Sequence, residues 1–169
     1  AMSGEDLSKE EILTLFEAAR WAPSGFNFQP WRFIYATHES PEFEKFLSFL
    51  TESNRDWCKN ASVLVVTISK NEREPGSPQK THSFEAGAAF QNLALQAADM
   101  GIIAHGMGGI LPDVIKEKLN ISDEYTIDMM VAIGKPGNIK DLPEALQARE
   151  APSQRKPLSE IAFEEKFSS

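Results

Sequence analysis

Hydrogen-bonding side chains are concentrated in one short stretch near the amino end, residues 22–31, with the sequence APSGFNFQPW. This stretch carries the hydroxyl of Ser24 and the carboxamides of Asn27 and Gln29, and a proline lies near each of its ends. Proline fixes φ, so the two prolines stiffen the backbone that carries these groups. A carboxamide offers donors and acceptors on a short stem, which suits the polar edge of a heterocycle. We therefore interpret the stretch as a rigid binding loop, although Ser and Asn are also common in ordinary turns.

A family resemblance rests on this loop and on four later segments. Residues 18–33, AARWAPSGFNFQPWRF, resemble the FMN-dependent nitroreductase family, whose pattern is A-P-S-x-x-N-x-Q-P-W-x-F. Further matches follow in the family's order: FQNL at 90–93, GMGGI at 106–110, VAIGKP at 131–136 and RKPL at 155–158. The resemblance runs from about Ser8 to Phe163, and it implies a single nitroreductase-like FMN-binding domain over residues 1–169.

The resemblance implies that the loop contacts the flavin. In the family this loop lies against the ribityl chain and the pyrimidine edge, so Ser24, Asn27 and Gln29 are expected to bind FMN. Asn54 lies eight residues before a predicted strand, where many members place an Asn that contacts the ring. Many members also carry a basic residue three positions after that Asn, and this chain has Trp57 there instead.

The resemblance implies that two glycines and two cationic residues also bind FMN. Gly108 and Gly109 match a loop whose backbone approaches the flat ring without a Cβ clash, so that its amides face N5 and O4. A donor at N5 stabilises the charge that develops as hydride arrives, and no side chain is then required as a catalytic acid or base. Arg155 and Lys156 match the family's phosphate-binding tail. A flexible turn and a solvated pair of cations are the alternative interpretations.

One family motif is not found in the sequence. Family members usually carry an R-R-S-x-R-like segment before the first helix, and that segment binds the FMN phosphate. This sequence starts just before the helix and lacks the motif. We expect weaker FMN binding for this reason, with Arg155 and Lys156 carrying more of the positive charge. A native start further upstream is the other interpretation.

The activity that the resemblance implies is that of a homodimeric oxidoreductase with FMN at the dimer interface. NAD(P)H would reduce FMN, and a nitroaromatic, quinone or similar acceptor would then take the electrons in a ping-pong mechanism. One alternative is a flavin-binding or cofactor-free relative without redox turnover that acts through protein contacts. Another is an offshoot with other flavin chemistry, such as flavin fragmentation or dehalogenation.

Apolar spacing indicates the elements that must position the loop. Ser8 and Glu11 form a capping box before a helix whose apolar face contains Ile12, Phe16 and Ala19. The run at 62–68 is continuous and β-branched, which is typical of a strand buried on both faces. Further elements are predicted as a strand at 31–37, a short helix at 41–50, a long helix at 83–100, a short helix at 112–119 and a strand at 127–134.

The remaining segments decide the fold class. Residues 71–81 are rich in helix and strand breakers and predict a surface loop, with a lid as the alternative. The alanine-rich helix at 83–100 favours close helix packing, including packing between subunits. The polar tail carries apolar residues at Leu142, Leu158 and Phe163, and such a tail more often wraps over a neighbour. We predict an α+β fold, a mixed β-sheet flanked by helices, with a long central helix and an extended C-terminal tail.

Composition and isolated residues disfavour a nucleic acid partner, a membrane protein and a metal site. With 17 Lys and Arg against 25 Asp and Glu, the net charge of −8 disfavours a nucleic acid partner. No apolar run approaches the roughly 20 residues of a membrane helix and no signal peptide is visible, so we expect a cytoplasmic protein without a membrane partner. Cys58, the only cysteine, is expected to fill space beside Trp57. His38 and His82 lack metal-ligand spacing, so no metal is predicted, and His105 is expected to be structural, with proton donor as the alternative.

Overall fold

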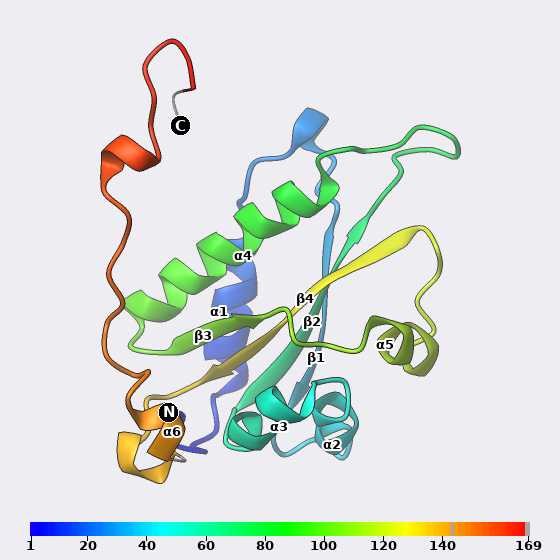
Figure 1. The fold of residues 1–169 in the computed structure, drawn as a ribbon. Helices are drawn as coiled ribbons and strands as arrows, with labels where there is room; N and C mark the ends of the chain where they lie inside the picture. Colours follow the sequence, from blue (N-terminus) through cyan, green and yellow to red (C-terminus); the bar gives the residue numbers. More distant parts are fainter. Residues whose placement is uncertain (143, 168–169) are drawn as a thin grey trace.

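The fold is built on one sheet of four strands in the order β1-β2-β4-β3. The computed structural model describes residues 1–142 and 144–167, and Figure 1 shows their ribbon. The strands are β1 (Trp31–Thr37), β2 (Val63–Lys70), β3 (Ile103–Met107) and β4 (Tyr125–Gly134). The α-helices are α1 (Lys9–Arg20), α2 (Phe43–Leu47), α3 (Glu52–Cys58), α4 (His82–Asp99), α5 (Pro112–Lys118) and α6 (Glu144–Gln147). This arrangement confirms the α+β class with a long central helix.

The sheet is antiparallel in each described pair, whereas the sequence predicted a mixed sheet. The connections from β1 to β2 and from β3 to β4 join strand ends at the same end of the sheet, whereas α4 crosses from the end of β2 to the opposite end, where β3 starts. β2 and β3 therefore run in the same direction, but β4 lies between them and is antiparallel to both. Thr37 at the end of β1 pairs with Val63 at the start of β2, and β4 returns along both β2 and β3. A parallel pair would need a crossover to the opposite end of the sheet.

Helices cover both faces of the sheet, and each face has its own core. Helices α1 and α4 pack on one face, against the β2 and β4 side chains Val63, Val65, Val131 and Ile133. Helices α2, α3 and α5 lie on the other face, against Leu64, Val66, Met130 and Ala132. Alternate residues of β2 therefore enter different cores, which is why its sequence is apolar at nearly every position.

Local signals in the sequence explain several element boundaries. Helix α1 begins with the predicted capping box, in which Ser8 Oγ accepts from the amide of Glu11 and the Glu11 carboxylate accepts from the amide of Ser8. Strand β1 has the predicted bounds. Helix α4 is followed by Gly101, which has a φ of 69°. Glycine adopts this left-handed conformation without the steric cost that a Cβ would add, so it ends the helix. The helix expected at 41–50 is shorter, Phe43–Leu47, with Leu50 in a bridge to Ile110.

The polypeptide after β4 leaves the sheet as an extended tail. Figure 1 shows it passing through α6 and then running apart from the helices, in orange and red. Leu142 is half-buried, whereas Leu158 is 74% exposed. The Phe163 ring meets the Phe167 ring of the same tail edge to face, with ring centroids 4.9 Å apart. Among the described helices, none is both long enough and apolar enough to cross a bilayer.

Candidate functional site

The predicted binding loop lies between α1 and the edge strand β1. Its residues include a 3-10 turn, Gly25–Asn27, and its backbone is left-handed at Phe26, Asn27 and Gln29, with φ values of 54°, 57° and 50°. The hydroxyl of Ser24 accepts from the amide of Gln29 at 2.9 Å and so closes the loop. The Gln29 carboxamide donates to the Asn27 carbonyl at 3.0 Å. Within the described chain the Asn27 side chain makes no hydrogen bond, so it is available to a ligand.

A second group of predicted residues meets where α3 approaches the segment after β3. The carbonyl of Gly109 accepts from Asn54 Nδ2 at 3.1 Å, from Thr51 Oγ1 at 3.1 Å and from the amide of Thr51 at 3.0 Å. The Asn54 oxygen accepts from Trp57 Nε1 at 3.4 Å. These contacts fix the orientation of both Asn54 and Gly109. Thr51 was not singled out in the sequence, where nothing distinguishes it from an ordinary residue before a helix.

The backbone at the two glycines suits a planar ligand. Among the described residues, the amides of Gly108 and Gly109 donate to no acceptor, and a Cβ on Gly108 would meet nothing within 4 Å. Two amides without acceptors, with open space beside Gly108, can donate to a ring that carries acceptors along one edge. Gly106, which the sequence placed in the same loop, is instead a residue of β3.

A pocket of about 490 Å³ lies beside this group. It is lined by α3, β3 and the segment around α6, including Asn54, Trp57, His105 and Arg149. The His105 ring meets the Trp57 ring edge to face, with centroids 4.9 Å apart. His105 is on the exposed part of β3, and partial loss of solvent around its ring lowers the pKa of His105 below its ordinary value of 6.5, with Glu150 acting in the opposite direction. The neutral form is therefore favoured at neutral pH.

Arg155 and Lys156 are exposed residues of the extended tail. Arg155 donates to the hydroxyl of Ser153 at 2.7 Å, and Lys156 forms an ion pair with Glu160 at 3.5 Å. Their described polar contacts are all with other residues of the tail. Within one chain, the structure therefore does not bring these two cations to the other predicted site residues.

The binding loop and the glycine segment also lie apart within one chain. The loop precedes β1 and the glycines follow β3, and these strands are the two edges of the sheet. Three inter-strand spacings separate the edges, which amounts to about 14 Å. One chain thus presents two incomplete halves of the predicted site.

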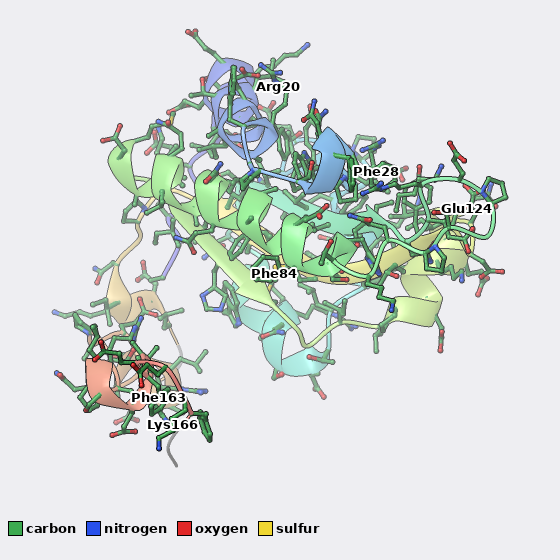
Figure 2. The ribbon with its side chains drawn as sticks, turned by 90° about the horizontal axis from the view of Figure 1, so that it is seen from above. Arg20, Phe28, Phe84, Glu124, Phe163 and Lys166 are labelled. Carbon is green, nitrogen blue, oxygen red and sulfur yellow. The ribbon has the colours of Figure 1, made fainter. Side chains whose placement is uncertain are left out.

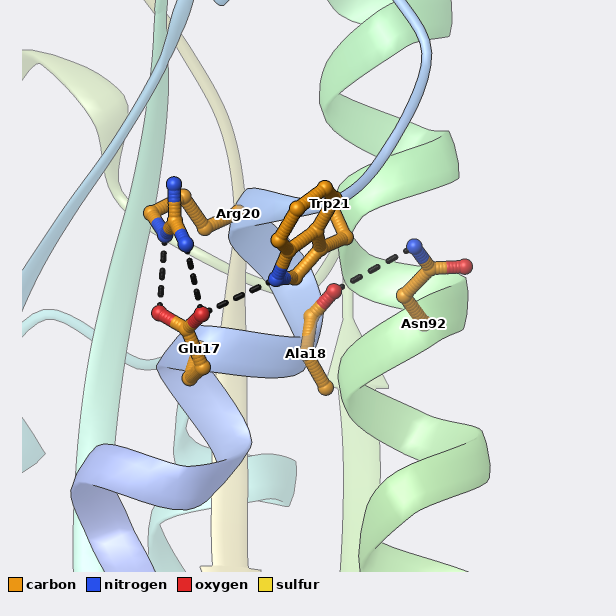
Figure 3. Close-up of polar contacts among 5 residues, drawn as sticks. All are labelled: Glu17, Ala18, Arg20, Trp21 and Asn92. Carbon is orange, nitrogen blue, oxygen red and sulfur yellow. Dashed lines mark hydrogen bonds and ion pairs between the residues drawn. The ribbon is translucent and has the colours of Figure 1, made fainter.

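Arg20, the last residue of α1, forms an ion pair with Glu17 of the same helix. Its guanidinium makes two bonds to the Glu17 carboxylate, at 2.7 Å and 2.6 Å, and Trp21 Nε1 donates to the same carboxylate at 2.9 Å (Figure 3). These bonds, first from Arg20 and then from Trp21, lower the pKa of Glu17 to about 2. Figure 3 also shows Asn92 of α4 donating to the Ala18 carbonyl, at 3.3 Å, which ties α4 to α1.

A buried carboxylate supports the loop and was missed in the sequence. Glu85 in the first turn of α4 is only 6% exposed, and it accepts from the amide of Gly25 at 3.0 Å. One signal could have found it, since Glu85 is four and eight residues before Ala89 and Leu93 and so shares their buried stripe.

Cys58 is a residue of the core below the sheet face that α2, α3 and α5 cover. It is fully buried, and its Sγ lies 3.4 Å from the sulfur of Met107. Burial raises the pKa of the thiol to about 12, so the reactive thiolate is not formed at neutral pH. In the described part of the chain, no group of three or more His, Cys, Asp or Glu side chains could hold a metal ion.

Comparison with known proteins gives consistent matches. The model of the Nitroreductase family matches residues 2–56 and 38–135. A crystal structure of an oxidoreductase containing FMN is 47% identical with a TM-score of 0.96, over 99% of this chain and 87% of that one. An FMN complex from Desulfovibrio desulfuricans, provisionally named a nitroreductase, shares the fold at 24% identity, with a TM-score of 0.78 over 99% and 90% of the chains. An Archaeoglobus fulgidus protein provisionally named NADH dehydrogenase/NAD(P)H nitroreductase is 28% identical, over 85% of this chain and 82% of its own.

Proposed function

Because this chain belongs to the nitroreductase family, we propose that it is an FMN-dependent oxidoreductase that uses NAD(P)H in a ping-pong sequence. The acceptor is a nitroaromatic, a quinone or a similar small molecule. The observation that carries the proposal is the 47% identity to an oxidoreductase containing FMN, which extends over 99% of the chain.

The residues present fit this cofactor. The free amides of Gly108 and Gly109 suit hydrogen bonding to the ring edge, and the unpaired carboxamide of Asn27 suits the polar groups of the flavin. Asn54 positions Gly109 through its bond to the Gly109 carbonyl. Arg155 is the candidate for the phosphate, because its guanidinium can bind in bidentate fashion.

The chemistry that FMN supplies when bound is hydride acceptance from a reduced nicotinamide and electron transfer to a second substrate. The protein's contribution is positioning and electrostatic stabilisation. Backbone amides at Gly108 and Gly109 are fixed donors, so they stabilise developing negative charge without reorganising. No side chain is assigned as a catalytic acid or base, and orientation of the two reacting groups is the other contribution that we propose for the protein.

We further propose that the active form is a homodimer with one FMN site at each junction of two chains. The two halves of the site lie at opposite edges of the sheet, so a second copy can supply the half that one chain cannot. Large apolar side chains are exposed in the loop and along α4, including Phe26 at 90%, Phe84 at 82% and Leu95 at 61%. Figure 2 shows the loop that carries Phe28 next to the end of α4 that carries Phe84. The exposed apolar tail residues Leu158 and Ile161 provide a second surface for the neighbour.

The test is an absorbance spectrum of the purified protein before and after FMN addition and desalting. A retained flavin band that NAD(P)H bleaches under anaerobic conditions supports the proposal, provided that quinone or nitro acceptors then give steady turnover. A protein that retains FMN but oxidises no NAD(P)H with any such acceptor refutes the proposed activity. Sedimentation analysis tests the assembly, and a monomer that still turns over would refute the interface site.

A further inference from the structure

We propose that Glu85 is a positioning residue of the cofactor site, which holds the binding loop, residues 24–29, in its ligand-ready conformation. The inference rests on the proposed function, since it assigns a support to the loop that carries Ser24, Asn27 and Gln29. Glu85 itself is not assigned a contact with FMN. It acts through the backbone amide of Gly25.

The loop needs a support because its backbone is not a conformation that its residues favour. Phe26, Asn27 and Gln29 have left-handed φ values of 54°, 57° and 50°, and none of them is glycine. Side chains with a Cβ adopt this region reluctantly, so a short segment with three such residues relaxes unless neighbouring groups fix it. Most polar contacts of the loop are internal, such as the bonds of Ser24 to the amides of Asn27 and Gln29.

Glu85 provides a contact from outside the loop, across 60 positions of sequence. Its Oε1 accepts from the amide of Gly25 at 3.0 Å, from Gln79 Nε2 at 3.0 Å and from Thr81 Oγ1 at 2.7 Å. The fit is close, because a Cβ on Gly25 would lie 3.3 Å from both the Glu85 oxygen and the Gln79 nitrogen. One carboxylate oxygen thus joins the loop, the segment at 71–81 and the start of α4.

The burial of this carboxylate indicates that its role is to accept a hydrogen bond from the loop, because a buried charge adds nothing to solubility. Glu85 is 6% exposed, and its second oxygen, Oε2, has no partner among the described residues. Burying a carboxylate is costly, and α4 would be better served here by an apolar residue like those at Ala89 and Leu93. The cost is accounted for if the position must accept a hydrogen bond from Gly25.

A second contact acts on the same loop from the same segment. The guanidinium of Arg73 lies over the ring of Phe26, 4.1 Å from the ring centroid, and this ring is otherwise 90% exposed. Arg73 and Gln79 both belong to the segment that the sequence interpreted as a surface loop or a lid. Through Glu85 and Phe26 this segment therefore contacts the binding loop at two places.

The experiment compares Glu85→Ala with Glu85→Gln in the full chain. The Gln variant keeps one oxygen that can accept from Gly25, and it loses no partner at Oε2 because that atom has none among the described residues. In the FMN-free protein, NMR is expected to show loss of hydrogen-exchange protection at the Gly25 amide in Glu85→Ala and its retention in Glu85→Gln. FMN affinity, measured by quenching of flavin fluorescence, is expected to fall about tenfold or more in Glu85→Ala and to stay within about threefold in Glu85→Gln.

Two controls separate positioning from general destabilisation. Asn92→Ala removes a hydrogen bond between α4 and α1 without touching the loop, so FMN affinity should not change even if the melting temperature falls. Glu85→Asp keeps the charge but withdraws the carboxylate from Gly25, and it replaces Glu85→Ala if that variant does not fold. The expected loss of FMN affinity is then seen in Glu85→Asp and not in Glu85→Gln.

The outcomes are distinguishable from failure of the proposed function. Unchanged protection of Gly25 in Glu85→Ala overturns the inference, and so does unchanged FMN affinity in that variant when the wild type binds FMN. Equal losses in Glu85→Gln and Glu85→Ala also overturn it, because an acceptor at this position would then not suffice. A wild-type protein that binds no FMN refutes the proposed function, while the Gly25 amide still decides whether Glu85 holds the loop.

Discussion

Replacing Gly109 with alanine should strain the junction between α3 and the glycine segment. A Cβ at this position would lie 2.5 Å from Asn54 Nδ2 and 2.8 Å from Thr51 Oγ1. Both of these atoms donate to the Gly109 carbonyl at 3.1 Å, so moving them away from the new methyl group also breaks their hydrogen bonds. Overpacking and lost hydrogen bonds together should lower the free energy of unfolding by about 2 kcal/mol.

The measurement is urea unfolding at a fixed protein concentration, with the melting temperature as a second readout. For a chain of 169 residues, a loss of about 2 kcal/mol corresponds to a fall in Tm of about 4–8 °C. Gly108→Ala is the matched control for stability, because a Cβ there meets nothing within 4 Å and the backbone is not left-handed. Both variants add one methyl group to neighbouring residues of the same segment.

A double-mutant cycle identifies the contact responsible. Asn54→Ala removes the nearer obstacle, so Gly109→Ala should cost less in that background than in the wild type. The reasoning is refuted if Gly109→Ala is as stable as Gly108→Ala. It is also refuted if the cost of Gly109→Ala does not depend on Asn54.

Three further predictions concern single groups. The thiol of Cys58, with a pKa raised to about 12 by burial, should not react with a thiol reagent at pH 8 until urea unfolds the chain, and reaction in the folded protein would contradict its burial. His105 should titrate below 6.5 by NMR, and a pKa at or above 6.5 would contradict this; because the unfolded chain binds the proton at a higher pH than the folded chain, the contribution of His105 to stability should rise with pH between the two pKa values. Ser8→Ala should lower the free energy of unfolding by about 1 kcal/mol through loss of the capping box. A free energy of unfolding in urea equal to that of the wild type would show that the cap does not contribute to stability.

The sequence predicted those elements whose residues carry a strong local pattern. The apolar run of β2 and the capping box of α1 are such cases, because burial on two faces and a satisfied helix end both require particular residue types. Helix α3 was missed because its sequence, ESNRDWC, has no apolar stripe and only Cys58 is buried. Strand β3 was missed because it is a short edge strand that contains Gly106, and its pairing with β4 depends on residues distant in sequence.

For the candidate site, the sequence suggested residues but not their arrangement. The sequence suggested Asn54 and Gly109 separately. Nothing in it predicted that the Asn54 side chain donates a hydrogen bond to the Gly109 carbonyl. The division of the site between two sheet edges follows from the strand order, which long-range pairing decides. Glu85 was overlooked because a carboxylate in a helix is usually solvated, and only its spacing from Ala89 marks it as buried.

Helix α4 connects the two halves of the site within each chain. Its first turn supports the binding loop through Glu85, and its last turn leads through Gly101 into β3, which ends at the glycine segment. A single inserted residue would lengthen α4 by about 1.5 Å and rotate everything beyond it by about 100°. Such a change would misplace either the loop or the glycines relative to the other. The proposed site therefore depends on the number of residues in α4, independently of which residues they are.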